Sequence, residues 1–197
     1  MLKEKLSAYT IILASGSPRR QQFFKDLNLD FDIRIKSVNE VYPEHLVGAE
    51  ISDYLAQLKA TPFENELKQN ELLITSDTIV WHNNIALGKP KNNDDAFAML
   101  KSLSENTHEV ITSVNFKLDD QQKTVNDTTK VTFKTLTDDE IWFYINNYKV
   151  LDKAGAYGIQ DWIGHIGVTT IEGSYFNVVG LPTHLVYETL NSLDLNL

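Results

Sequence analysis

The 197-residue chain contains no cysteine and only five histidines. Without cysteine it cannot form disulfide bonds, use a thiol nucleophile or bind zinc through thiolates. The histidines also lack the His-x-x-x-His spacing that places two ligands on one helix face. Carboxylates are therefore the metal ligands that the composition offers, and they favour a hard divalent cation.

Positive charge is scarce as well, since 27 acidic against 18 basic residues give a formal net charge of −9. Such a chain lacks the basic face with which a general nucleic-acid binder contacts the backbone. A local basic pocket for a small anion is still compatible with this balance. No segment approaches the ~20 apolar residues of a membrane span, and the run at 11–14 is shorter than the ~7–15 residues of a signal-peptide core. We therefore expect a cytoplasmic protein that binds neither nucleic acid nor membranes.

The segment Thr10–Phe24 combines a short apolar strand, a turn of small residues and the start of a helix. Ser17 is a candidate N-cap, and Pro18 suits the first helical turn. Arg19 and Arg20 then fall where the helix dipole disfavours cations, unless an anion lies beside the free N–H groups. The segment predicts either a phosphate-binding turn or an ordinary capped helix whose arginines face water. The spacings of a P-loop and of a dinucleotide-binding loop are both absent.

Two carboxylates and two lysines are further candidates for a site. Asp77 interrupts 72–80, an apolar run rich in β-branched residues that is typical of a central strand. A carboxylate there must be paired, hydrogen-bonded or bound to a metal, for a structural or a functional reason. Glu40 follows a predicted strand and is either functional or an ordinary solvated acid. Lys59 and Lys89 are either surface lysines or anion ligands.

The remaining pattern alternates between strands and helices. We expect strands over 31–36, from 107, and over 124–136, 163–171 and 178–179, with a hairpin return at 85–90. Helices are expected over 17–28, from 49 to 69 with an interruption at Pro62, over 94–103, over 141–147 after a capping box at Thr137–Glu140, and from Pro182. This order predicts an α/β fold with a mixed sheet, as one domain over 1–197 without a linker.

The segment 152–160, rich in small residues, has two interpretations. Gly155 and Gly158 allow another chain segment to approach closely, and Gln160 offers both an acceptor and a donor to the edge of a nucleobase. Alternatively, the segment is a compact connector in which Tyr157 packs into the core.

The unusual residues together fit phosphoryl chemistry on a polyphosphate. Two carboxylates can hold a magnesium ion that keeps most of its waters, while cationic side chains neutralise phosphate oxygens. The set consists of Arg19, Arg20, Glu40, Lys59, Asp77 and Lys89.

Five segments resemble the Maf family, the septum-formation-associated nucleotide pyrophosphatases. They are ILASGSPRR at 12–20, SDTIV at 76–80, GKP at 88–90, DKAGAYGIQ at 152–160 and EGSYFNVVGLP at 172–182. They occur in the family's order, so the resemblance covers nearly the whole chain. The segment 104–108 departs from the family pattern, in which a glycine often follows the serine, but it carries none of the candidate catalytic residues.

The resemblance implies a fold like that of inosine triphosphate pyrophosphatase, with an elongated mixed sheet, two lobes around a cleft, and frequent dimerisation. It also implies hydrolysis of a nucleoside triphosphate between its α and β phosphates, with Mg²⁺ or Mn²⁺. Asp77 and Glu40 would handle the metal and the attacking water, with Asp77 as general base. Lys59 and Lys89 would stabilise the charge of the transition state. The substrate and its phosphates would be bound by Ser15, Ser17, Arg19, Arg20 and Thr78.

The form of the segment that ends in Gln160 is similar to the family branch that prefers dTTP and UTP, in which this glutamine would read the O4 and N3 edge of the pyrimidine. The branch that acts on 7-methyl-GTP differs here. The leading hypothesis is therefore a dTTP/UTP pyrophosphatase that removes unwanted nucleotides. A nucleotide-binding regulator of cell division and a 7-methyl-GTP pyrophosphatase are the alternatives.

Overall fold

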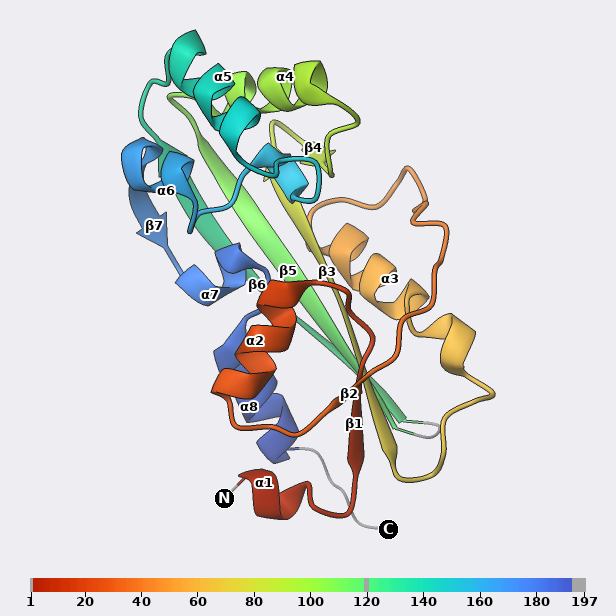
Figure 1. Cartoon of the computed structure of the whole chain (residues 1–197). Coiled ribbons are helices and arrows are strands. Elements are labelled where there is room, and N and C mark those ends of the chain that lie inside the picture. Colours follow the sequence, from red (N-terminus) through yellow and green to blue (C-terminus); the bar gives the residue numbers. More distant parts are fainter. Residues whose placement is uncertain (1, 119–120, 193–197) are drawn as a thin grey trace. The chain divides into compact units, whose positions relative to one another are not determined.

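The structure is a computed structural model of the chain, and it describes residues 2–118 and 121–192 (Figure 1). The chain divides into two compact units. The first unit contains residues 1–77, 112–127 and 180–197, and the second contains 78–111 and 128–179. Three long strands contribute to both units, and they are β3 (Glu71–His82), β5 (Thr107–Leu118) and β6 (Gln121–Phe133).

The strands form a seven-stranded sheet in the order β2-β1-β3-β5-β6-β7, with β4 paired to β3. β1 (Thr10–Leu13) is parallel to both β2 (Asp32–Ile33) and β3. β4 (Ile85–Leu87) is antiparallel to β3, and β7 (Val168–Glu172) is antiparallel to β6. The prediction of an α/β fold with a mixed sheet is therefore confirmed.

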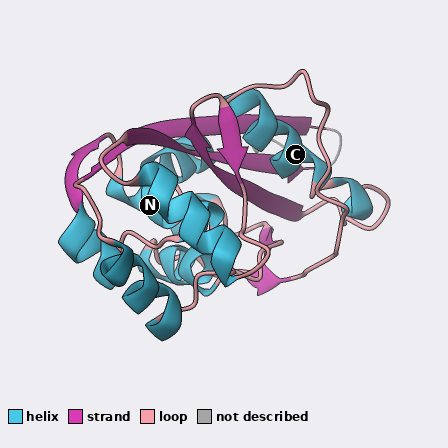
Figure 2. Ribbon diagram, turned by 90° about the horizontal axis from the view of Figure 1, so that it is seen from above, coloured by secondary structure: helices cyan, strands magenta, loops and turns pink. Residues whose placement is uncertain are grey.

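In the first unit, helices pack on both faces of the strands (Figure 2). Because alternate residues of a strand point to opposite faces, Leu72 and Ile74 join one core and Leu73 joins another. The first of these cores includes Phe24 of α2 and Val186 of α8. The helices of this unit are α1 (Leu2–Lys5), α2 (Pro18–Asp26), α3 (Ala49–Leu58), the 3₁₀ turn η1 (Thr61–Phe63) and α8 (Thr183–Ser192).

This alternation also determines the face of β3 to which Asp77 points. Asp77 lies two residues beyond Thr75 and four residues beyond Leu73. All three share one face of β3. The hydroxyl of Thr75 donates to the carbonyl of Ala56 at 2.6 Å, so this face is covered by the C-terminal end of α3. The fold thus places Asp77 beside the residues that follow α3.

The second unit has a core of its own, built on the remaining parts of the long strands. Its helices are α4 (Asn93–Leu103), α5 (Asp138–Asn147), the 3₁₀ turn η2 (Ala154–Ala156), α6 (Trp162–Gly167) and α7 (Tyr175–Val179). α5 begins with the predicted capping box, in which Thr137 and Glu140 bond reciprocally to backbone N–H groups. α4 and α5 lie together, with Phe97 stacked on Trp142 at 4.9 Å between ring centroids.

Two expected elements near the first motif are shorter than predicted. The strand expected over 31–36 covers only Asp32–Ile33, because it pairs with β1 through two residues alone. Phe31 packs against the core that contains Phe24, but the apolar side chains that follow it are exposed, Ile33 at 50% and Ile35 at 60%. The helix expected to reach residue 69 ends at Leu58 and gives way to η1, where Pro62 lacks the N–H that a continuing α-helix needs.

Of two strands expected near the C-terminal end, one is wrong in part and the other is wrong. The segment 163–171 begins as α6 and becomes β7 only at Val168. A short apolar run with a buried face is compatible with either structure, so periodicity alone does not separate them. Val178 and Val179 belong to α7, and the N–H of Asn177 in this helix donates to the hydroxyl of Ser174 at 3.3 Å. Among the described residues, no helix has the length and apolar character needed to cross a membrane.

Candidate active site

The turn before α2 is built as the sequence predicts. Ser17 is the N-cap, and its hydroxyl accepts the N–H of Arg20 at 3.5 Å. The hydroxyl of Ser15, which is buried, accepts the N–H of Ser17 at 3.3 Å. Both hydroxyls therefore stabilise the turn, and each keeps its own proton for donation to a ligand.

Arg20 is held by backbone carbonyls, which are partners that neither interpretation of this segment of the sequence included. Its Nε donates to the carbonyl of Gly180 at 2.8 Å, and its NH1 donates to the carbonyl of Ser76 at 3.0 Å. Burial lowers the pKa of the guanidinium from its usual value, and attraction to Asp77 acts in the opposite direction. Protein carbonyls thus hold this arginine at the helix N-terminus and connect the first, second and last motifs.

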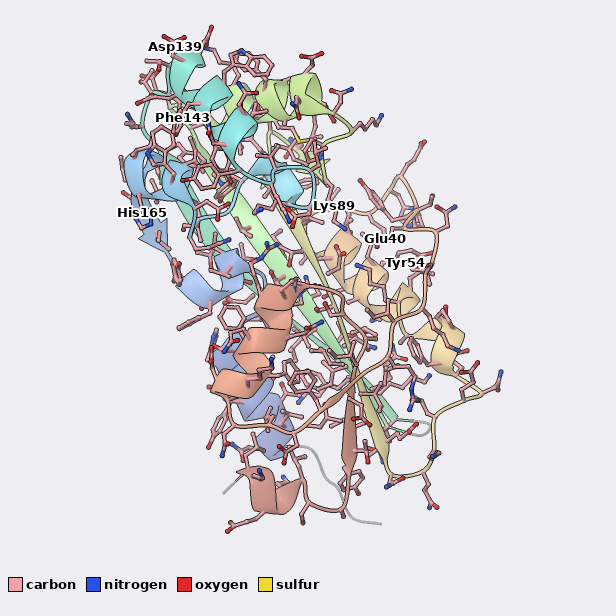
Figure 3. All side chains as sticks on the ribbon, viewed as in Figure 1. Glu40, Tyr54, Lys89, Asp139, Phe143 and His165 are labelled. Atoms are coloured by element: carbon pink, nitrogen blue, oxygen red, sulfur yellow. The ribbon has the colours of Figure 1, made fainter. Side chains whose placement is uncertain are left out.

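Lys59 joins the two candidate carboxylates. It directly follows α3, and its Nζ lies 2.6 Å from Oδ1 of Asp77 and 3.4 Å from Oε1 of Glu40. Asp77 is nearly buried, whereas Glu40 is 45% exposed. Glu40 lies on the loop that precedes α3 (Figure 3). A carboxylate inside β3 is therefore compensated by a lysine that the adjacent helix end supplies.

The carbonyl of Ser76 brings the cations of this site together. It accepts from Arg20 and also lies 3.5 Å from Nζ of Lys59. The first unit therefore gathers four of the residues predicted from the sequence around one point of β3, namely Arg20, Glu40, Lys59 and Asp77. The hydroxyl oxygen of Ser76 is buried and has no hydrogen-bond partner among the residues that the structure describes.

The donor set suits a hard cation that is only partly bound by protein. No group of three or more acidic or histidine side chains arranged to hold a metal occurs within the described part of the chain. Glu40 and Asp77 are two carboxylates beside one ammonium, and Mg²⁺ is commonly bound by one or two carboxylates together with waters and substrate phosphates. The residues present thus fit such an ion.

Lys89 and Thr78 belong to the second unit. Lys89 is exposed on a loop that is held in place on either side, because Pro90 is buried and the carbonyl of Gly88 accepts the N–H of Gly155 at 3.0 Å. This bond connects the GKP and DKAGAYGIQ motifs. Thr78 is half-buried on β3, directly after Asp77.

Gln160, also in the second unit, lies beside charged residues that sequence reasoning missed. Its Nε2 donates to Oδ1 of Asp161 at 3.4 Å. Oδ2 of Asp161 accepts the hydroxyl of Tyr144 at 2.8 Å and lies 3.7 Å from Nζ of Lys153. Tyr157 is buried, as the interpretation of 152–160 as a compact connector expects. No spacing pattern could have indicated this cluster, because its members come from separate elements and one of them, Lys153, is a buried lysine.

Part of the last motif stabilises the fold. The amide nitrogen of Asn177, which is fully buried, donates to the carbonyl of Val110 and to the hydroxyl of Thr129, both at 2.9 Å. Gly173 has φ of 126° and faces Thr129, whose Oγ1 would lie 2.7 Å from an added Cβ. The sequence similarity over 172–179 thus has a structural explanation in the second unit.

Comparisons with known proteins agree with these motifs. The family model described as Maf-like protein matches residues 10–193. The curated dTTP/UTP pyrophosphatase of Flavobacterium johnsoniae is 65% identical over 193 residues, which cover 98% of this chain and 100% of that protein. The dTTP/UTP pyrophosphatase of Bacteroides thetaiotaomicron is 44% identical over 95% of this chain and 98% of its own length. Among solved structures, the nucleoside-triphosphatase / dITP/XTP pyrophosphatase of Mycobacterium abscessus is 12% identical over 95% of this chain and 100% of that chain, with a TM-score of 0.47.

Proposed function

We propose that this chain, which belongs to the Maf family, hydrolyses dTTP and UTP to the nucleoside monophosphate and pyrophosphate. The observation that carries the proposal is the contact of one lysine, Lys59, with the carboxylates of both Glu40 and Asp77. Carboxylates and cations concentrated at one point are what phosphoryl transfer requires. The names of the curated relatives, dTTP/UTP pyrophosphatases, support the choice of substrate.

A divalent cation, Mg²⁺ or Mn²⁺, would be held by Glu40 and Asp77 and would neutralise phosphate charge when bound. Asp77 would accept a proton from the water that attacks phosphorus at the α–β anhydride. A new P–O bond then forms, the bond to the bridging oxygen breaks, and pyrophosphate leaves. Lys59 would stabilise the negative charge that develops on the phosphate oxygens.

The turn before α2 would bind phosphate oxygens through Arg19 and the hydroxyls of Ser15 and Ser17. Arg20 would contribute its charge from a position fixed by protein carbonyls. The roles of Thr78, Lys89 and Gln160, on the second unit, remain predictions from the family resemblance, as do the single functional domain over 1–197 and the homodimer. Light scattering coupled to gel filtration measures the last of these directly.

A panel of triphosphates, assayed with Mg²⁺ and with Mn²⁺, tests the function. We expect pyrophosphate as the product, with dTTP and UTP as the preferred substrates and no turnover in EDTA. Orthophosphate as the sole product would contradict cleavage between the α and β phosphates. Faster hydrolysis of 7-methyl-GTP would assign the chain to the alternative branch, and tight binding without turnover would favour the regulatory alternative.

A further inference from the structure

Asp161 directs its side chain away from the helix that it begins. It is the N-cap residue of α6, yet its carboxylate makes no capping hydrogen bond to that helix. Instead, Oδ2 accepts the hydroxyl of Tyr144 at 2.8 Å and lies 3.7 Å from Nζ of Lys153. Oδ1 is left to face Gln160, whose Nε2 lies 3.4 Å away.

The partners of Asp161 fix the orientation of its carboxylate. Lys153 is 7% exposed and brings a positive charge to the carboxylate. Burial is the larger cause that raises the pKa of Tyr144 above its usual value, and the hydrogen bond to Asp161 raises it further. The hydroxyl of Tyr144 therefore keeps its proton and donates it. Both partners are donors, and an ionised carboxylate can only accept.

This chemistry determines which way the amide of Gln160 points. Because Asp161 can only accept, the nitrogen of the amide must face it, and the oxygen must face elsewhere. The oxygen Oε1 is buried and finds no donor among the residues that the structure describes. Gly158 leaves room for this arrangement, since a Cβ there would lie 2.6 Å from Nε2 of Gln160 and 2.8 Å from Oδ2 of Asp161.

We propose that Asp161 is a positioning residue that locks the amide of Gln160 and thereby selects uracil and thymine over cytosine. The inference rests on the proposed function, in which Gln160 reads the pyrimidine edge. Uracil and thymine present an N3–H donor and an O4 acceptor, whereas cytosine presents an N3 acceptor and an amino donor. An unrestrained glutamine could flip to match either base. The carboxylate of Asp161 prevents the flip, because a flipped amide would place its oxygen against the carboxylate oxygens.

The variant Asp161→Asn tests this role with almost no change in side-chain volume. The carbonyl oxygen of the new amide would still accept from Tyr144 and Lys153, so its NH₂ group would face Gln160 and hold the opposite amide orientation. We expect the ratio of kcat/KM for UTP to that for CTP to fall by about tenfold or more. The conservative variant Asp161→Glu keeps an acceptor and should retain a preference for UTP.

Asp152→Asn is the matched control, since Asp152 also contacts Nζ of Lys153, at 2.9 Å, and this change likewise converts an acid to its amide. Its UTP-to-CTP ratio should equal that of the unmodified protein. An unmodified protein that hydrolyses UTP and CTP equally well would overturn both the substrate choice and this inference. An unmodified protein that prefers UTP, with the same preference in Asp161→Asn, would overturn the inference alone. Circular dichroism of each variant verifies that its fold is intact.

Discussion

Arg20 and Gly180 are 160 residues apart in the chain and are joined by a hydrogen bond of 2.8 Å from Nε to the carbonyl oxygen. The same guanidinium reaches the carbonyl of Ser76 at 3.0 Å. A planar guanidinium can donate in two directions at once. The ammonium of lysine is a single group on a flexible stem, so it holds two such acceptors less well. One side chain therefore connects the start of α2, the strand that carries Asp77, and Gly180 in the segment between α7 and α8.

We expect Arg20→Lys to lower the free energy of unfolding by about 1–3 kcal/mol, because buried carbonyls lose donors. Pyrophosphate release should fall as well, since the support for Ser76 weakens next to Asp77. Urea unfolding and a pyrophosphate assay measure the two effects. Lys25→Gln, an exposed lysine in the last turn of the same helix, is the control and should change neither by much. Stability unchanged in Arg20→Lys would contradict the role given to these two bonds.

Asp77→Asn should leave a folded protein that releases pyrophosphate about 10²–10⁴-fold more slowly, the range typical of a lost general base. The amide keeps the shape of the side chain but can neither accept the proton from water nor hold a cation as a carboxylate does. Glu64→Gln is the control, because Glu64 is an exposed acid that pairs with Lys117 at 3.4 Å. Normal activity in Asp77→Asn would exclude Asp77 as the base, whatever its contact with Lys59.

The sequence predicts those parts of the fold in which local patterns and packing agree. β3 follows from its β-branched run, and α5 follows from the capping box at Thr137. The α6 segment is mispredicted because a short apolar run with one buried face has the same composition in a helix as in a strand.

The sequence likewise predicts some residues of the candidate site but not the contacts between them. Asp77 stands out in the sequence because a charge inside an apolar strand requires a partner, but its partner Lys59 becomes evident only once α3 is placed against β3. The contacts of Arg20 with carbonyls have no local signature, since Ser76 and Gly180 are distant in the chain. Asp161 looks like an ordinary helix cap, and only the structure shows its carboxylate turned toward Gln160.

Gly155→Ala should destabilise the protein by about 1–3 kcal/mol. Gly155 has φ of 64°, a left-handed conformation, and a Cβ there would lie 2.8 Å from Cγ2 of Val80. The paired control is Gly88→Ala, since a Cβ at Gly88 meets nothing within 4 Å and its carbonyl can still accept the N–H of Gly155. Thermal unfolding followed by circular dichroism compares the two variants. Equal melting temperatures would show that neither the conformation nor Val80 constrains position 155.

The ion pair of Arg34 with Glu71 should give the protein a stability component that depends on acid pH. Two guanidinium nitrogens donate to the two carboxylate oxygens at 3.0 and 2.8 Å. The hydrogen bond from Arg34 lowers the pKa of Glu71 from 4.5 to about 2. Because the folded pKa is depressed, the stabilisation is fully present above the unfolded pKa of 4.5 and is lost as the pH falls through 2.

The size of this component is at most about 3 kcal/mol, and it is reduced by solvent because the side chain of Arg34 is 35% exposed. Urea unfolding from pH 2 to pH 6 measures it as the change in free energy with pH. In Glu71→Gln no proton binds at this position, so the curve should lose that part of its slope while keeping the contributions of the other acids. A slope between pH 2 and 4.5 that is the same in both proteins would mean that Glu71 titrates alike in the folded and unfolded chain, and the bidentate pair would then contribute nothing to acid sensitivity.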